Sequence, residues 1–236
     1  MEYYSRVEPT ERHTLRFVVN ALAALRPGAL ALEFGCGPTV HHLVPLAARA
    51  AEIHAADLLP DNLRAIRRWQ MGAADSHDWS AFTRETLRLE GIESPSAHDI
   101  FMREDLVRRR LTRCVLGDAR LQHPLGPQFA RRYDCVISLF CADSATSSLA
   151  DWMRYTRNIT SLLAPGGLLV LAALRHCRSY FVGGVRFPSP CIDERHLQLA
   201  LNAAGLAREQ QAIEVAEVPD QRSHGFDSIV MASAIA

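Results

Sequence analysis

A glycine-rich turn follows an apolar run near the start of the chain, and its residue types favour a ligand that lies against the backbone. The stretch reads ALALEFGCGPTVHHL over residues 29–43, with Gly35 and Gly37 on either side of Cys36. Glycine weakens strands and helices alike, so its presence here indicates that something must approach the main chain closely. The glycine pair alone is a weak signal, because Val40 stands where a dinucleotide fingerprint has its third glycine.

Two aspartates follow the glycine turn, each at the end of a strand that we expect from the sequence. Asp57 ends the stretch EIHAAD (52–57), about 20 residues beyond the glycines, where a carboxylate can accept the ribose hydroxyls of an adenosine. Asp118 ends RCVLGD (113–118). Pro38 and Thr39 would crowd a pyrophosphate at the next helix, so the pattern points away from a dinucleotide. The alternative is that these residues only form tight turns and capping contacts.

Strands and helices alternate along the chain, and this order would bring the turn and the acids to one edge of a sheet. Residues 71–112 are more polar and less periodic, and we expect an irregular insertion containing helix there. Parallel strands need crossover connections, so the fold expected is a doubly wound parallel α/β sheet with its ligand site beyond the carboxyl ends of the strands. The apolar periodicity predicts strands over 29–35, 52–57, 113–118, 133–141 and 168–174, helices over 11–25, 39–50, 60–70, 148–163 and 192–204, a hairpin over 179–189 turning at 183–184, and late strands near 208–218 and 226–235.

The composition suits one sizeable domain spanning residues 1–236. The chain has 26 basic and 26 acidic residues, which is not the footprint of a nucleic-acid binder. Membrane-spanning helices need about 18 consecutive apolar residues, which the sequence lacks, and the N-terminus lacks the layout of a signal peptide, so we expect a cytoplasmic protein. Six cysteines are scattered without a C-x-x-C pair, and the adjacent histidines 41 and 42 cannot share one helical face. Neither disulfides nor a metal site is therefore predicted.

The order of glycine turn, Asp57, Asp118 and a final antiparallel strand pair is typical of a class I methyltransferase, which uses S-adenosyl-L-methionine (SAM) as cosubstrate. Nearly the whole chain resembles the nicotinamide, phenylethanolamine and indolethylamine N-methyltransferase family. The resemblance implies a Rossmann-like seven-stranded sheet, mostly parallel with one antiparallel strand, helices on both faces and a short N-terminal lid over residues 1–12. It rests on LEFGCGPTVHHL, ADLLPDNLRAIRRW, HDWS, DCVISLFCADSATSSLADWMRYTRNITSLLAPGGLLVL and SYFVGGVRF.

The resemblance also implies which residues line the cofactor. His41 stands where the family commonly has a tyrosine near the cofactor carboxylate, although a solvent-facing histidine at a helix start is an alternative. A sulfonium cation favours aromatic faces, and the candidates are Tyr3, Tyr4, Phe140, Tyr180 and Phe181, each of which could instead be core packing. The cofactor residues implied by the resemblance are Tyr4, Gly35, Thr39, His41, Asp57, Asn62, Asp118, Ala119 and Leu139, to which the glycine turn adds Gly37 and the fourth strand Phe140.

On the acceptor side, Asp143 matches a family acid that would bind the substrate and take up its proton, although it could instead cap its loop. Tyr180 and Ser189 match acceptor contacts, and Tyr3 belongs to a paired-tyrosine motif near the start. The family's second acceptor-side carboxylate is replaced by Ala173, and the helical segment that usually precedes the paired tyrosines is missing. The usual substrates are therefore in doubt.

Three functions are compatible with these residues. The first is methyl transfer to a nitrogen of a small molecule, less basic or heteroaromatic, with Asp143 and Tyr180 at the acceptor. The second is ring closure of SAM alone, in which its α-amine attacks its γ-carbon to give azetidine-2-carboxylate and methylthioadenosine, with Asp143, Ser138 or His41 holding the proton. The third is SAM binding without catalysis. The partners expected are a small-molecule substrate or SAM alone, without nucleic acid or membrane, in a monomer or homodimer.

Overall fold

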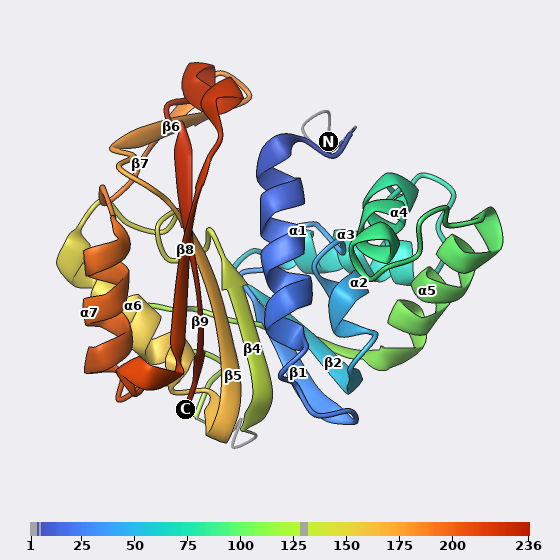
Figure 1. The fold of residues 1–236 in the computed structure, drawn as a ribbon, viewed down its shortest axis with the longest axis horizontal. Coiled ribbons are helices and arrows are strands. Elements are labelled where there is room, and N and C mark those ends of the chain that lie inside the picture. The colour runs from blue at the N-terminus through green and yellow to red at the C-terminus, as the bar shows by residue number, and fades with distance from the viewer. Residues whose placement is uncertain (1–3, 5, 128–131) are drawn as a thin grey trace. The chain divides into compact units, whose positions relative to one another are not determined.

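Parallel strands alternate with helices in the first half of the chain, as its apolar runs predict. The computed structural model describes residue 4 and residues 6–127 and 132–236, and it separates into two units, Met1–Leu116 and Gly117–Ala236 (Figure 1). The expectation that residues 1–236 form one domain stays a prediction. Tyr3 lies outside the described residues.

The first unit contains three parallel strands and the helices that cover them. Helix α1 buries Leu15, Val18 and Leu22, and α3 buries Leu63 and Ile66, as their apolar spacing requires. The elements are α1 (Pro9–Leu22), β1 (Ala29–Phe34), α2 (Leu43–Leu46), β2 (Ala50–Asp57), α3 (Pro60–Gln70), α4 (Ser80–Leu89), α5 (Ala97–Arg110) and β3 (Leu111–Leu116).

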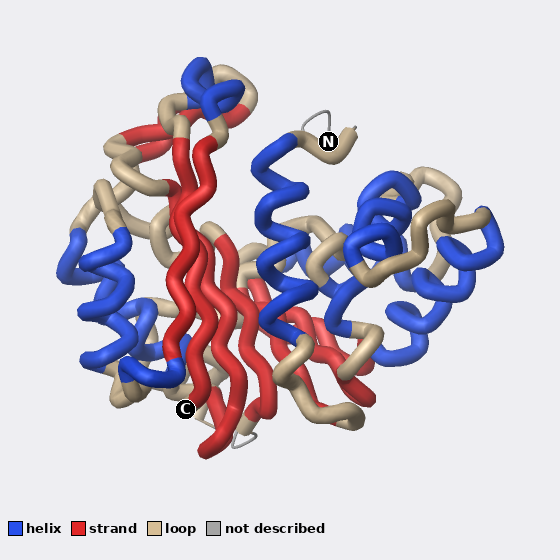
Figure 2. The backbone as a smooth tube through the Cα atoms, in the orientation of Figure 1, coloured by secondary structure: helices blue, strands red, loops and turns tan. Residues whose placement is uncertain are grey.

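The described residues of the second unit form strands of the large sheet, the helices beside them and a separate hairpin. Helices α6 and α7 lie side by side along these strands (Figure 1). The hairpin β6–β7 lies beyond one end of β8 and β9, next to η3 (Figure 2). The elements are β4 (Tyr133–Leu139), α6 (Leu149–Thr160), β5 (Leu163–Leu174), β6 (Ser179–Val182), β7 (Val185–Pro188), α7 (Glu194–Ala203), η2 (Arg208–Gln210), β8 (Gln211–Glu217), η3 (Pro219–His224) and β9 (Ser228–Ile235).

The strands are hydrogen-bonded in the order β3-β2-β1-β4-β5-β9-β8. Within the units, β1 is parallel to β2 and β2 to β3, β4 is parallel to β5, and β9 is antiparallel to both β5 and β8. The expected seven-stranded, mostly parallel sheet with one antiparallel strand is therefore confirmed. The register pairs Phe34 with Ala56 and Asp57 with Leu116, so the glycine turn after β1 begins beside the end of β2.

Several expected boundaries are wrong. The helix expected over 39–50 is reduced to the four residues of α2, because Pro45 has no N–H to extend a helix and β2 already begins at Ala50. The region 71–112 is more regular than expected, since it contains α4 and α5. Strand β3 ends at Leu116, two residues before Asp118, and α1 begins at Pro9, inside the expected lid.

Candidate active site

Asp57 ties the glycine turn to the start of α3. Its Oδ2 accepts the Gly37 N–H at 2.8 Å, while Oδ1 accepts the Leu59 N–H and the Asn62 side-chain amide, both at 2.9 Å. Gly37 has a φ of +59°, which a residue with a side chain rarely adopts. These hydrogen bonds bring three of the predicted cofactor residues, Gly37, Asp57 and Asn62, together in one local cluster. The carboxylate shapes the turn in addition to any contact with a ligand.

Thr39 completes the turn. Its hydroxyl donates a hydrogen bond to the Cys36 carbonyl at 2.8 Å, and its side chain is buried. Burial and the neighbouring Glu33 and Asp57 raise the pKa of the Cys36 thiol well above its usual value. Cys36 is therefore a packed thiol without the thiolate character of a nucleophile.

His41 is buried, so the alternative of a solvent-facing histidine is wrong. Its ring stacks on Trp79 with centroids 5.3 Å apart and planes 15° from parallel, and Tyr4 and Phe82 lie 5.4 and 5.0 Å from it. Burial, with His42 and His77 nearby, lowers the pKa of His41 well below its usual value. Among the described residues, no group hydrogen-bonds to Nδ1. His41 is thus a neutral ring with one buried nitrogen available to a ligand.

A buried acid–histidine pair behind the turn was not predicted from the sequence. Glu33 Oε1 lies 2.8 Å from His42 Nδ1, and burial raises the pKa of Glu33. Its second oxygen has no hydrogen-bond partner among the described residues. Removing one member of such a pair leaves a buried group unpaired, so Glu33 and His42 hold this wall of the turn together.

In the second unit, Asp118 and Ala119 lie on the connection before β4. Asp118 is bound by its neighbour Arg120, whose Nε and Nη2 donate to the two carboxylate oxygens at 2.8 and 2.7 Å. This bond lowers the pKa of Asp118. The Ala119 carbonyl accepts a hydrogen bond from the Asn158 side chain at 2.9 Å, which anchors the connection to α6. Sequence reasoning missed Arg120.

The exit of β4 carries Ser138, Leu139 and Phe140. Ser138 and Leu139 are buried on the strand. Phe140 has a φ of +55° and donates its N–H to the Ala172 carbonyl at 2.8 Å, so the chain turns sharply there. A positive φ outside glycine costs roughly 1–3 kcal/mol and is common at functional sites. The structure leaves Phe140 half-exposed, unlike a core residue.

Asp143 is fully buried just after this turn. Its Oδ2 accepts the N–H of Leu174, the last residue of β5, at 2.9 Å, so this bond joins the turn to the neighbouring strand. Its Oδ1 has no hydrogen-bond partner among the described residues. Burial raises the pKa of Asp143 to about 6. A cavity of about 10 Å³ adjoins it, with Ser138 and Ala173 in its wall, so the position that would carry a second acid holds only a methyl group.

Tyr180 lies on β6 of the hairpin, and Ser189 directly follows β7. Tyr180 stacks on Phe187 across the hairpin at 5.6 Å, and burial raises the pKa of Tyr180 while a hydrogen bond with Ser144 partly offsets the rise. Ser189 is buried after β7, and its backbone N–H bonds to the Arg178 carbonyl at 3.0 Å. Phe181 is 40% exposed and faces away from the Tyr180–Phe187 pair, since neighbouring residues of a strand alternate in direction.

Within the described residues, no three side chains of histidine, cysteine, aspartate or glutamate are grouped to hold a metal ion. No helix in residues 6–127 or 132–236 is both long and apolar enough to span a bilayer. All six cysteines, each of them described, are free.

Comparison with known proteins identifies relatives of this arrangement. The NNMT/PNMT/TEMT family matches residues 1–234. Nicotinamide N-methyltransferase of Sus scrofa is 30% identical over 200 residues, covering 84% of this chain and 74% of the relative. Indolethylamine N-methyltransferase of Mus musculus is 27% identical, covering 75% of this chain and 66% of its own length.

Solved structures share the fold at low sequence identity. The N-methyltransferase NodS from Bradyrhizobium japonicum WM9 has a TM-score of 0.56 at 19% identity, covering 96% of both chains. The 1,6-didemethyltoxoflavin-N1-methyltransferase of Burkholderia thailandensis has a TM-score of 0.56 at 18% identity, covering 96% of this chain and 80% of that one. These likenesses establish the class I methyltransferase fold. With the family match over residues 1–234, they show that the chain belongs to the NNMT/PNMT/TEMT family and is a SAM-dependent methyltransferase.

Proposed function

We propose that the chain transfers the methyl group of SAM to a weakly basic nitrogen of a small molecule. The observation that carries the proposal is Asp143, a buried carboxylate with one oxygen lacking a partner, beside an alanine where a second acid would stand. Most buried polar groups are hydrogen-bonded, so an unpaired one is a candidate for contact with a ligand. Asp143 is thus the proposed acceptor-side acid.

The first unit fits the polar parts of SAM. A carboxylate has about four lone-pair positions, and Asp57 already uses three of them on Gly37, Leu59 and Asn62. We therefore expect Asp57 to accept one ribose hydroxyl instead of both. The unpaired Nδ1 of His41 would bond to the methionine part, beside Thr39 and the aromatic side chain of Tyr4.

The second unit would supply the adenine and acceptor contacts. Asp118 is proposed to bind the adenine amino group, with Ala119, Leu139 and Phe140 beside the cofactor. Tyr180 and Ser189 would contact the acceptor. Tyr3 is proposed from the sequence alone.

The chemistry requires alignment and removal of a proton. SAM supplies a methyl group on a sulfonium, which a nitrogen lone pair attacks while the S–C bond breaks and its electron pair stays on sulfur. The protein must hold the nitrogen in line with that bond at about 3–3.5 Å. Where the nitrogen carries a proton, Asp143 Oδ1 is the proposed acceptor of that proton.

The single acid limits the class of acceptor. An alkyl ammonium titrates near pH 10, about four units above the pKa of about 6 of Asp143, so the carboxylate is a poor base for it. A cation would also need a second counter-charge, and Ala173 offers none. A heteroaromatic nitrogen is neutral at pH 7 and needs no such support. Asp143 and Ala173 together therefore favour a heteroaromatic or other weakly basic nitrogen.

Product analysis tests the function. The purified protein is incubated with SAM alone and with panels of alkylamines and heteroaromatic nitrogens, and the products are identified by mass spectrometry. We expect S-adenosylhomocysteine only with an acceptor, at a rate that Asp143→Asn lowers and the exposed control Asp220→Asn leaves unchanged. Methylthioadenosine formed from SAM alone would instead establish ring closure to azetidine-2-carboxylate, and tight SAM binding without either product would establish a binding protein.

The acceptor class has its own test. Ala173→Asp restores a second carboxylate next to Asp143, so kcat/KM for an alkylamine should rise relative to that for a heteroaromatic acceptor. A ratio that does not change would contradict the argument from the missing acid. The cytoplasmic location is proposed on the six free cysteines, and a monomer or homodimer stays a prediction.

A further inference from the structure

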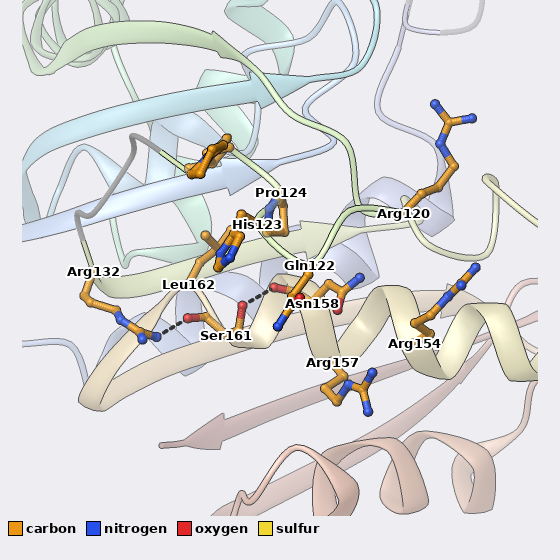
Figure 3. Close-up of a pocket in the computed structure, with 13 residues that line it drawn as sticks. Arg120, Gln122, His123, Pro124, Arg132, Arg154, Arg157, Asn158, Ser161 and Leu162 are labelled. Carbon is orange, nitrogen blue, oxygen red and sulfur yellow. Dashed lines mark hydrogen bonds between the residues drawn. The ribbon is translucent and has the colours of Figure 1, made fainter.

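A basic groove lies between α6 and the connection that precedes β4, away from the residues assigned above to the acceptor. It has a volume of about 960 Å³ (Figure 3). Its arginine and histidine residues are Arg120 and His123 on the connection, Arg132 before β4, and Arg154 and Arg157 on α6. The "basic groove" below means the hollow lined by these five side chains.

The groove exists because the connection leaves one side of α6 uncovered. A crossover between parallel strands of a sheet usually contains a helix, but the described residues 117–127 form only turns. The Asp118 N–H bonds to the Pro124 carbonyl at 2.8 Å and closes these residues into a loop. Asn158 binds this loop to α6 through the Ala119 carbonyl. The hollow is therefore lined by the arginines, His123, Gln122 and Asn158 together with apolar residues such as Leu125 and Leu162.

The charge of the groove is unbalanced. None of the described residues that line it is acidic, although the chain as a whole has equal numbers of acidic and basic residues. Arg154 is paired with Asp151, and Arg132 donates to the Ser161 carbonyl, whereas Arg157 has no ion-pair partner among the described residues. Arg154 and Arg157 are three residues apart on α6, and both line the hollow (Figure 3).

We propose that the basic groove binds the phosphate groups of a small phosphorylated molecule. Guanidinium groups match phosphate oxygens through paired N–H donors. The volume lies within the range of small-molecule sites, roughly 300–1,000 Å³. The side chains of Arg120, Arg154 and Arg157 are exposed, so the molecule could enter the groove from solvent without rearrangement of the core.

Arg120 connects the groove to the SAM site, and this step rests on the proposed role of Asp118. Arg120 now bonds to both oxygens of Asp118, which the adenine amino group would also need. The Arg120 side chain is 56% accessible and that of Asp118 is 19% accessible, so the guanidinium lies toward solvent and can change partner. A phosphate that draws Arg120 into the groove would free Asp118 for adenine. Phosphate and SAM should then strengthen the binding of each other.

Binding is tested with inorganic pyrophosphate by isothermal titration calorimetry on the full chain at constant ionic strength. The variant Arg154→Gln/Arg157→Gln removes two groove charges. The control Arg195→Gln/Arg208→Gln removes two exposed charges elsewhere in the same unit. We expect the groove variant to weaken pyrophosphate binding at least about tenfold and the control less than twofold. Equal weakening of pyrophosphate binding in the groove variant and in the control would show a non-specific charge effect and would overturn the proposal. Absence of saturable binding by the wild type would also overturn it.

Coupling is tested by titrating SAM with and without saturating pyrophosphate. Pyrophosphate should tighten SAM binding by about two- to fivefold, and SAM should tighten pyrophosphate binding by the same factor. Arg120→Gln should abolish this coupling. Weaker or unchanged SAM binding in the presence of pyrophosphate would refute the link through Arg120. Failure of SAM to bind at all would refute the proposed function instead, while the pyrophosphate titration would still report on the groove.

Discussion

Replacing Asp57 by asparagine tests the geometry of the glycine turn. The amide can keep its oxygen toward Leu59 N–H and Asn62, which leaves an NH₂ group facing the Gly37 N–H that Asp57 Oδ2 now accepts at 2.8 Å. One charge-assisted hydrogen bond of about 1.5–3 kcal/mol is therefore lost, and two donors face each other. The loss falls on a side chain that is only 7% exposed, so water cannot replace the missing acceptor.

The same free energy sets the size of two effects. For a chain of this length, about 2–4 °C of melting temperature corresponds to 1 kcal/mol, so Asp57→Asn should melt roughly 4–10 °C lower. If SAM binding requires the ordered turn, its Kd should rise about ten- to hundredfold. Calorimetric titration of SAM and a thermal melt measure both quantities on one sample.

The control is Asp61→Asn, four residues after Asp57 in the sequence. Asp61 is an exposed acid in the first turn of α3 that pairs with Arg64 and does not touch the glycine turn. Asp61→Asn should leave the melting temperature unchanged and the Kd for SAM within about twofold of the wild-type value. Asp57→Asn could lower the melting temperature and yet leave the SAM affinity unchanged when it is measured well below that temperature. This result would show that Asp57 only supports the fold. No change in either quantity would contradict the hydrogen-bond geometry itself.

Four further predictions concern Asp143, His41 and Gly225. Methyl transfer should fall as the pH drops through about 6, where Asp143 protonates, and Asp143→Asn should remove this limb of the pH–rate profile. The pKa of Asp143 is about 6 in the folded protein and above its usual 3.8, so its contribution to stability is complete below pH 3.8 and is lost as the pH rises to about 6. The total loss is about 3 kcal/mol. Urea unfolding of the wild type and of Asp143→Asn at pH 4 and pH 7 would measure it. His41→Phe keeps the stack on Trp79 but removes the unpaired nitrogen, so SAM should bind about five- to tenfold more weakly without loss of melting temperature. Gly225→Ala should destabilise the protein by about 2 kcal/mol or more in urea unfolding, because a Cβ would lie 2.3 Å from the Ser179 carbonyl oxygen at a φ of +100°, and Gly205→Ala, which also has a positive φ but open space around it, should cost less.

The order of strands and most helices could be predicted because each has a strong local pattern. Pro60 and the apolar spacing of Leu63 and Ile66 place α3 at the predicted residues. Helix α5 was missed as a separate element although Ser96 and Asp99 form a capping box, a signal that the sequence contains. Periodicity over 97–110 is weak because this helix buries only Ile100 and Val107.

The sequence could predict the candidate-site residues that directly follow a strand. It could not predict the contacts between their side chains. Asp57 follows from its place after an apolar strand. The pairs Glu33–His42 and Asp118–Arg120 do not, because a hydrogen bond between side chains depends on rotamers and on the path of the turn. Histidine 41 illustrates the same limit, since only the packing of Trp79 against it shows that it is buried.

The two acids at strand exits differ in how many of their oxygens are satisfied, and this difference separates their roles. In Asp57 both oxygens accept hydrogen bonds from the surrounding chain, so its removal must affect stability together with ligand binding. In Asp143 only Oδ2 does, and burial of the other oxygen costs free energy in the folded state. This cost is consistent with the proposal that the free oxygen of Asp143 binds a ligand. Removing the charge at Asp143 should therefore leave the protein at least as stable at pH 7 while it loses activity, the opposite of the result expected at Asp57.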